Sequence, residues 1–373
     1  MSTDLKATAV PSEIAIAART GSLELVLHIG SGKTGTSSIQ QMLNKGRERV
    51  AELGTLFPRS PGLGRHVQLG LFIRPDAELG KLINWHKQGY SSPAEFRKDF
   101  QGRFFAEIES SGLTRVLLSD EALYGCSVDA LKRLRAFTDE IARSIRVVVY
   151  LRRQDDHVCS RYQQVVKTGE VRRLAERLEQ VNYRKTYDYH ARLETWRRLI
   201  EPNEFVVRPF ESERFVAGSL YQDFFEAAGL GPWSDDLETP RPLNESLDAE
   251  AVEMLRIVNI YRVENEGAAP GLINNRKLVT RLAGSATGPT LTLPDSVLDA
   301  FMETWAESNR AVAREFLGDE TGQLFRAPRK SQNTTTEQRL DPARLDHFLQ
   351  LLELPKGMHE PLRRIVERET SSR

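Results

Sequence analysis

Three consecutive valines, Val147 to Val149, restrict the fold of this chain more than any other feature. A strand with one face in water alternates apolar and polar residues, whereas a strand that is buried on both faces does not alternate. Strands of the second kind are typical of parallel sheets whose crossover helices cover both sides. The segment 146–151 therefore predicts an α/β protein built on a parallel sheet.

Further apolar segments alternate with helical ones along the chain. We expect strands at 25–29, 115–119 and 204–208, and helices at about 37–51, 93–109, 128–143, 155–166 and 187–199. Beyond residue 210 the pattern is mainly helical, at about 213–228, 247–263 and 295–317. Residues 55–91 are rich in Gly and Pro and are expected to be irregular. The predicted fold is a P-loop-type parallel sheet flanked by helices, with a mainly helical C-terminal part.

The same pattern predicts how the chain is divided. We expect a flexible N-terminus at 1–22, one α/β domain at 23–320, a linker at 321–340 and a helical tail at 341–373. Asp341 and Pro342 are typical of a helix N-cap followed by a first-turn proline. The tail is expected to dock on the core or to form a dimer with a second subunit.

The overall charge gives no sign of a polyanionic partner. Lys plus Arg and Asp plus Glu number 52 each in 373 residues, so we expect no nucleic acid and no general attraction to an anionic membrane. We find neither a signal peptide nor an apolar run long enough to span a membrane. The two cysteines, Cys126 and Cys159, lack metal-ligand spacing. A cytoplasmic setting fits these features.

A glycine-rich turn follows the first expected strand. A turn of this kind before a helix points backbone N–H groups at one spot, and the helix N-terminus adds partial positive charge. The pattern of a nucleoside triphosphatase loop fails here, because the first glycine of that pattern would fall at Leu27. The residues expected to hold an anion are Gly30, Ser31, Gly32, Lys33, Thr34, Gly35, Thr36 and Ser37.

A second candidate element follows the valine strand. Arg152 stands at the carboxyl end of that strand, where open α/β sheets bind ligands. Ser160 lies about one turn into the next helix and is expected to reach the same ligand. A guanidinium fork with a hydroxyl suits a terminal phosphate. Basic residues also outnumber acidic ones between 143 and 198, inside a chain of net charge zero.

These two elements together resemble motifs of a known enzyme family. Leu27-His28-Ile29-Gly30, then Lys33-Thr34-Gly35-Thr36-Ser37-Ser38, is similar to the 5′-phosphosulfate loop of the sulfotransferases that use 3′-phosphoadenosine 5′-phosphosulfate (PAPS). Tyr150-Leu151-Arg152-Arg153-Gln154-Asp155-Asp156, with Ser160, resembles their 3′-phosphate motif. The resemblance covers about residues 23–318 and is greatest to the bacterial sulfotransferase-like proteins. It implies PAPS as co-substrate, no metal ion, and transfer of a sulfuryl group to an acceptor hydroxyl.

The chain also departs from that family pattern. Residue 32 is Gly where bacterial relatives often carry His, and Ser38 stands where animal cytosolic members have a Trp that stacks on adenine. The group that stacks on adenine must therefore come from elsewhere. Arg276 and Lys277 are the candidates for the basic loop that relatives fold over the 3′-phosphate.

Two residues are expected to carry the chemistry. Lys33 is placed to stabilise the leaving oxygen as negative charge develops on it. Glu121, just after the strand 115–119, is the expected general base, as the resemblance implies, although it and Asp120 would also favour the N-terminus of a following helix. His157 is the alternative base, and His28 is expected to be a packing residue.

Two other functions fit parts of the sequence. Val116 to Glu121 resembles the acidic strand of an ATP- or GTP-dependent kinase or NTPase, and Gly32-Lys33-Thr34 points the same way. A catalytically inactive nucleotide-binding scaffold is the other alternative. For a sulfotransferase, a hydroxyl-bearing small molecule or glycan is the expected acceptor, and a carbohydrate or glycolipid follows from family analogy alone.

Overall fold

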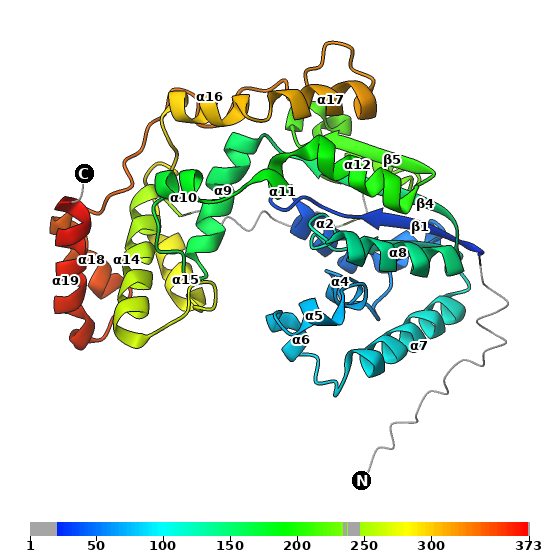
Figure 1. Cartoon of the computed structure of the whole chain (residues 1–373), viewed down its shortest axis with the longest axis horizontal. Helices are drawn as coiled ribbons and strands as arrows, with labels where there is room; N and C mark the ends of the chain where they lie inside the picture. The colour runs from blue at the N-terminus through cyan, green and yellow to red at the C-terminus, as the bar shows by residue number, and fades with distance from the viewer. Residues whose placement is uncertain (1–20, 234–236, 238–246, 372–373) are drawn as a thin grey trace, which may run out of the picture. The chain divides into compact units, whose positions relative to one another are not determined.

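The computed structural model of the chain describes residues 21–233, 237 and 247–371 (Figure 1). These residues form two compact units. Unit 1 comprises Met1–Arg152, Lys185–Arg241 and Glu307–Ala327, and unit 2 comprises Arg153–Arg184, Pro242–Ala306 and Pro328–Arg373. The flexible N-terminus predicted at 1–22 lies outside the described residues except for its last two positions, so it stays a prediction.

Unit 1 is built on a five-stranded sheet in which every pairing is parallel. The strands stand in the order β2-β3-β1-β4-β5. They are β1 (Leu23–His28), β2 (Thr55–Leu56), β3 (Arg115–Ser119), β4 (Ala142–Leu151) and β5 (Glu204–Pro209). The predicted α/β fold with a parallel sheet is confirmed. The short strand β2 lies within the stretch that was expected to be irregular.

Both faces of the sheet are buried, as the valine run predicts. Val147, Val148 and Val149 are all 0% exposed. On one face Val26 and Val148 belong to the same core cluster as side chains of the helices α2 (Thr36–Lys45) and α13 (Leu220–Ala228). The helices α8 (Val128–Ile141) and α12 (Tyr189–Ile200) pack against each other beside the sheet (Figure 1). Parallel strands thus acquire helices through their crossovers, and all carboxyl ends point to one edge.

The helices of unit 1 mostly begin where the sequence predicts, but several are shorter. The segment 37–51 is two helices because the chain breaks at Gly46, and α8 ends before Ala142, which enters β4. The unit contains α2 (Thr36–Lys45), α3 (Arg47–Glu52), α4 (Val67–Phe72), α5 (Asp76–Leu79), α6 (Ile83–His86), α7 (Pro93–Ser111), α8 (Val128–Ile141), α11 (Arg184–Tyr187, at its boundary), α12 (Tyr189–Ile200), α13 (Leu220–Ala228) and α17 (Ala306–Leu317).

Two expected long helices are interrupted. The segment 213–228 begins with the 3₁₀ turns η1 (Ser212–Arg214) and η2 (Val216–Gly218), and α13 starts only after the N-cap Ser219. The segment 295–317 is divided between α16 (Asp295–Glu303) and α17. Ala217 has a φ of 50°, which a continuous α-helix does not allow. The mainly helical C-terminal part is nevertheless confirmed.

Unit 2 is entirely helical in its described residues. It contains α9 (Gln154–Val166), α10 (Leu174–Gln180), α14 (Ala249–Glu266), α15 (Arg276–Ser285), α16 (Asp295–Glu303), η3 (Pro342–Arg344), α18 (Leu345–Leu351) and α19 (Lys356–Ser371). As predicted, Asp341 caps η3 by accepting a hydrogen bond from the Ala343 N–H. Apolar residues of the last two helices, including Phe348 and Leu362, belong to the core that α14 forms.

A buried ion pair also attaches α19 to α14. Arg256 of α14 is 2% exposed and donates to both carboxylate oxygens of Glu253 and to Glu369 Oε2, at 2.8, 2.6 and 2.7 Å. A buried guanidinium requires such partners, because its charge has been removed from water. The C-terminal helix is therefore part of the core of unit 2. Among the described residues, no helix is both long and apolar enough to cross a membrane.

Candidate functional site

The glycine-rich turn joins the carboxyl end of β1 to the N-terminus of α2 in unit 1. Gly32, Lys33 and Gly35 have φ values of 76°, 53° and 72°. The N-cap position of α2 is Gly35, and no side chain accepts a hydrogen bond there. The first N–H groups of a helix have no partner within the helix, so this end can receive an anion. The backbone of this turn is compatible with the predicted anion binding, which stays a prediction.

Glycine is required at two positions of this turn for different reasons. Gly35 has a positive φ, and a Cβ there would lie 2.3 Å from Leu220 Cδ2. At Gly30 a Cβ would lie 2.8 Å from Thr36 Oγ1 and 3.5 Å from the Cα of Glu121. The absence of a side chain at residue 30 thus lets the β3–α8 segment approach the turn. The turn and Glu121 are neighbours in unit 1.

Arg152 lies at the carboxyl end of β4, beside the same turn. Its Nη1 donates to the Lys33 carbonyl oxygen at 3.2 Å. Ser31 Oγ donates to the Tyr150 carbonyl oxygen at 2.7 Å, and Tyr189 Oη donates to the Arg152 carbonyl oxygen at 2.6 Å. Lys33 itself is exposed and Arg152 is half-buried. The Arg152 side chain and the Lys33 backbone, from two different strand ends, therefore lie next to each other at one edge of the sheet.

The carboxyl end of β3 contributes Asp120 and Glu121, which share one arginine. Arg65 Nε donates to Asp120 Oδ1 at 2.7 Å, and Arg65 Nη1 donates to Glu121 Oε1 at 3.2 Å. The Glu121 side chain is 35% exposed and that of Asp120 only 1%. The next helix, α8, has Ser127 as its N-cap, so neither acid caps a helix there. Glu121 keeps a carboxylate open to solvent beside the turn.

Asp120 is the buried member of this group. Burial raises the pKa of its carboxyl, although Arg65 opposes the shift. Its Oδ1 also accepts from the Ala122 N–H at 3.0 Å, whereas Oδ2 has no hydrogen-bond partner. A buried carboxylate that is only partly satisfied depends strongly on its counter-charge. Arg65 therefore supports the segment that carries Glu121.

Two buried histidines stabilise the same strand end without being available to a substrate. His28 Nδ1 is 2.8 Å from Ser119 Oγ, and His66 Nδ1 accepts from the Ser119 N–H at 3.1 Å. Burial lowers the pKa of each ring to about 3. Both are therefore neutral at ordinary pH. The position of His28 agrees with the packing role expected for it.

Ser160 and His157 lie in unit 2, on α9. The Ser160 side chain is half-buried, and His157 is only 1% exposed. The structure brings Lys33, Arg152 and Glu121 together within unit 1, and the pairing of Ser160 with Arg152 stays a prediction from their spacing. Of the predicted anion-binding residues, Thr34 lies just before the N-cap of α2, whereas Thr36 and Ser37 are its first two residues and Ser37 is exposed.

Sequence reasoning missed a segment that packs near Arg152. Leu324 and Phe325 are buried, and the Phe325 ring lies 6.5 Å from that of Tyr189, which contacts Arg152. Glu211 Oε1 accepts from the N–H groups of Arg326 and Ala327, both at 2.8 Å. This segment lies in the stretch expected to be a polar linker. The two adjacent apolar residues Leu324 and Phe325 were the sequence feature that could have indicated its burial.

Two aromatic side chains beside α2 were missed as well. Tyr221 makes a side-chain hydrogen bond with Ser38. Its ring is stacked with that of Trp233, with centroids 6.3 Å apart and planes inclined at 25°. The two residues are 12 positions apart along the chain, so no short motif links them. They place an aromatic surface next to the first turn of α2.

One group of side chains in the described part of unit 1 has ligand atoms close enough to hold a metal ion. His190, Glu194 and Glu315 offer ligand atoms within 4.8 Å of one another. Arg197 already lies among them, with Nη2 at 2.6 Å from Glu194 Oε1 and 3.8 Å from Glu315 Oε2. The guanidinium of Arg197 therefore offsets part of the negative charge of the two carboxylates.

Comparisons with known proteins identify no family. No protein-family model matches the chain. An uncharacterized protein of Archaeoglobus fulgidus is 27% identical over 217 residues, which are 54% of this chain and 54% of that protein. The chain thus spans about half the length of this curated relative. A sulfotransferase structure from Alicyclobacillus acidocaldarius is 17% identical, with a TM-score of 0.37 over 64% of this chain and 93% of the other.

Proposed function

We propose that the protein is a sulfotransferase that moves the sulfuryl group of PAPS to an acceptor hydroxyl. The observation that carries the proposal is the contact between Arg152 Nη1 and the Lys33 carbonyl oxygen at 3.2 Å. It joins two motifs, 119 residues apart, whose order and spacing resemble those of PAPS-dependent enzymes. A cradle of N–H groups next to an arginine suits a ligand with two anionic ends.

The two anionic ends of the donor nucleotide would be held by two different sets of residues. The turn 30–37, with the N-terminus of α2, would hold the 5′-phosphosulfate, because its backbone donors and Lys33 favour an anion. Arg152 and, from the sequence spacing, Ser160 would hold the 3′-phosphate. The protein would need no metal ion in this scheme, since the sulfuryl group carries less charge than a γ-phosphoryl group.

The reaction is an in-line displacement at sulfur. The acceptor oxygen forms a bond to sulfur while the bond from sulfur to the 5′-phosphate oxygen breaks, and adenosine 3′,5′-bisphosphate leaves. Lys33 stabilises the charge that develops on the leaving oxygen. Glu121, whose carboxylate is open to solvent beside the turn, takes the proton of the acceptor hydroxyl. Positioning and charge stabilisation supply most of the rate, as in phosphoryl transfer.

The kinase or NTPase alternative fits the β3 end less well. Such enzymes use an acid after this strand to bind Mg²⁺. Here Asp120 is buried against Arg65, and Glu121 is paired with the same guanidinium. An arginine between two carboxylates opposes the binding of a divalent cation by repulsion. The turn also lacks the first glycine of the triphosphatase pattern, whose position is Leu27.

Tyr221 and Trp233 are proposed to provide the surface for adenine. Ser38 takes the place of the stacking tryptophan of related enzymes, and Tyr221 is hydrogen-bonded to Ser38. Stacking of a base on an aromatic ring contributes about 1–3 kcal/mol.

We expect Trp233→Ala to weaken binding of adenosine 3′,5′-bisphosphate by about 5- to 150-fold, as measured by calorimetry. The control Trp85→Ala removes a tryptophan on α6; equal affinity of both variants for the ligand would contradict the assignment.

Titration calorimetry with adenosine 3′,5′-bisphosphate tests the proposed function directly. We expect binding in the presence of EDTA, and Lys33→Ala should weaken it by about 10- to 100-fold, the effect of removing a charge-assisted hydrogen bond. Lys45→Ala is the matched control, because Lys45 is an exposed residue at the other end of α2. Labelled PAPS with a panel of hydroxyl acceptors then tests transfer.

The alternatives predict different results in the same experiment. A kinase or NTPase would bind ATP with Mg²⁺ and would not bind adenosine 3′,5′-bisphosphate. An inactive scaffold would bind the bisphosphate but transfer no sulfate to any acceptor. Failure of the bisphosphate to bind the wild-type protein rejects the sulfotransferase proposal.

A further inference from the structure

Arg192, in the first turns of α12, contacts the segment that carries Glu121. Its Nη1 donates to the Cys126 carbonyl oxygen at 3.1 Å, and its Nη2 donates to the Lys185 carbonyl oxygen at 3.3 Å. The guanidinium carbon lies 6.0 Å from the centre of the Tyr124 ring. Arg192 is half-buried. Its charge is thus held at a defined place beside the β3–α8 segment.

No carboxylate of the described chain lies within ion-pair distance of Arg192. Nearby Arg65, which is similarly half-buried, has two carboxylate partners. A guanidinium has five N–H donors, and the two carbonyl contacts of Arg192 leave donors unused. Removing such a charge partly from water without an anion costs free energy. An anion that binds here would recover part of that cost.

Arg47 shows what a purely structural arginine looks like in the same unit. It also donates to carbonyl oxygens, those of Phe57 and Leu63, but it is only 7% exposed. Asn44 Oδ1 accepts from its Nε, and burial lowers its pKa to about 10. Arg47 is therefore enclosed, whereas Arg192 keeps contact with solvent.

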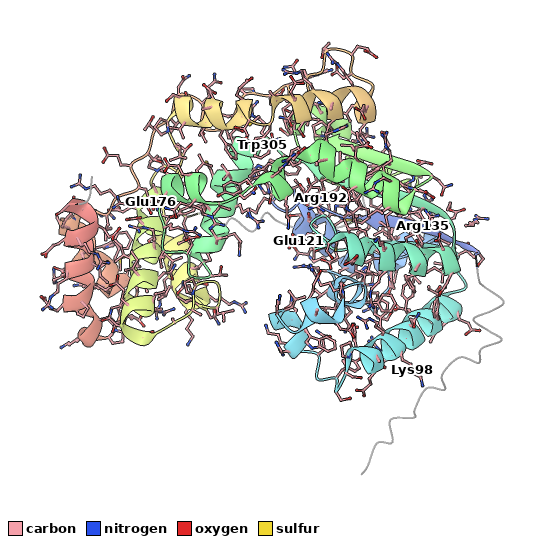
Figure 2. The ribbon with its side chains drawn as sticks, in the orientation of Figure 1. Lys98, Glu121, Arg135, Glu176, Arg192 and Trp305 are labelled. Atoms are coloured by element: carbon pink, nitrogen blue, oxygen red, sulfur yellow. The ribbon has the colours of Figure 1, made fainter. Side chains whose placement is uncertain are left out.

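A chain of contacts connects Arg192 to the candidate site. The Tyr124 ring, below the guanidinium, meets the Tyr189 ring edge-on at 6.5 Å, and Tyr189 Oη donates to Arg152. The Tyr124 N–H donates to the Ile29 carbonyl oxygen at 3.2 Å, directly before the glycine-rich turn. Arg192 therefore stands near the edge of the sheet where Lys33, Arg152 and Glu121 lie. Figure 2 labels Glu121 and Arg192.

We propose that Arg192 binds an anionic group of the acceptor, so that the substrate is a hydroxyl compound that also carries a carboxylate, phosphate or sulfate. The inference rests on the proposed function, in which Lys33 and Arg152 are occupied by the donor nucleotide. Glu121 shares the guanidinium of Arg65 with the buried Asp120, and neither carboxylate lies within ion-pair distance of Arg192. Arg192 has no ion-pair partner among the described residues, so its unused donors are available to an anionic group of the acceptor. Arg192 is thus a specificity-determining residue.

Two matched pairs of probe compounds test the inference. Methyl β-D-glucuronide is compared with methyl β-D-glucoside, and 4-hydroxybenzoate with 4-hydroxybenzamide. Each compound is assayed for sulfate transfer from labelled PAPS, and for binding to the bisphosphate-loaded protein by saturation-transfer NMR. We expect the charged member of a pair to be favoured by about 10- to 100-fold, the effect of a charge-assisted hydrogen bond. Arg192→Gln should remove that preference.

Arg135→Gln is the control. Arg135 belongs to α8 and donates to the Ile200 carbonyl oxygen at the far end of α12, and Figure 2 shows it well apart from Glu121 and Arg192. This variant should keep the preference for charged probes.

Absence of a preference for the charged members in both readouts, or a preference that survives in Arg192→Gln, overturns the inference. If adenosine 3′,5′-bisphosphate binds normally and sulfate is transferred to an uncharged acceptor, the proposed function stands and the anionic acceptor alone is rejected. If the bisphosphate does not bind the wild-type protein, the proposed function is rejected, and the inference that rests on it is rejected with it.

Discussion

Glu121→Gln is expected to lower kcat by about 10²- to 10⁴-fold, the usual contribution of a positioned general base. Glutamine keeps the size of the side chain and a hydrogen-bond acceptor toward Arg65, but it cannot take a proton from the acceptor hydroxyl. The side chain stands on the β3–α8 segment and not in the glycine-rich turn. We therefore expect the dissociation constant of adenosine 3′,5′-bisphosphate to stay within about twofold of the wild-type value.

The measurement is single-turnover transfer from labelled PAPS to the best acceptor of the panel. Glu140→Gln is the control, since Glu140 is an exposed residue of α8 in the same unit. Normal turnover in Glu121→Gln would show that another group accepts the proton. His157 was the alternative base, but a ring that is 1% exposed has little access to a substrate. A large loss of kcat in His157→Gln with Glu121→Gln unaffected would reverse the assignment.

The fold could be predicted because its signals are local. Three valines with no alternation indicate a strand buried on both faces, and the structure buries all three completely. The glycine-rich turn is equally local, since glycines and a lysine within seven residues determine its backbone. Arg152 follows its strand directly, so the parallel topology alone brings it to the edge where the turn lies.

The remaining parts of the site depend on contacts between distant segments. Arg65 is 55 residues before Asp120, inside a stretch whose Gly and Pro content suggested irregular structure. The strand β2 has only two residues, too few for an alternating pattern. Within the part of the chain that the structure describes, Arg192 forms its hydrogen bonds to backbone carbonyl oxygens, which every residue has. No sequence motif specifies such pairings, so the structure was needed to find them.

Arg65→Met is expected to reduce the free energy of unfolding by about 2–4 kcal/mol at pH 7.5. Breaking a buried ion pair costs about 3–5 kcal/mol because one charge remains without a partner, and the 34% exposure of the Arg65 side chain reduces that cost. The group left behind is Asp120, whose side chain is 1% exposed and whose Oδ2 already has no hydrogen-bond partner. Urea denaturation of the full chain measures the change.

The pH dependence separates this cause from a general packing defect. Burial raises the folded-state pKa of Asp120 above its unfolded value, and Arg65 opposes that shift. A group with a raised folded pKa contributes stability below the unfolded pKa and loses it as the pH rises through the folded pKa. Without Arg65 the pKa rises further, so the deficit of Arg65→Met should be small near pH 4 and largest near neutrality. Arg65→Met combined with Asp120→Asn should recover most of the loss, because the charge that then remains without a partner is that of the partly exposed Glu121 and no longer a buried one. A deficit of equal size at both pH values, or no recovery in the double variant, would mean that Arg65 stabilises this segment through packing and not through its charge.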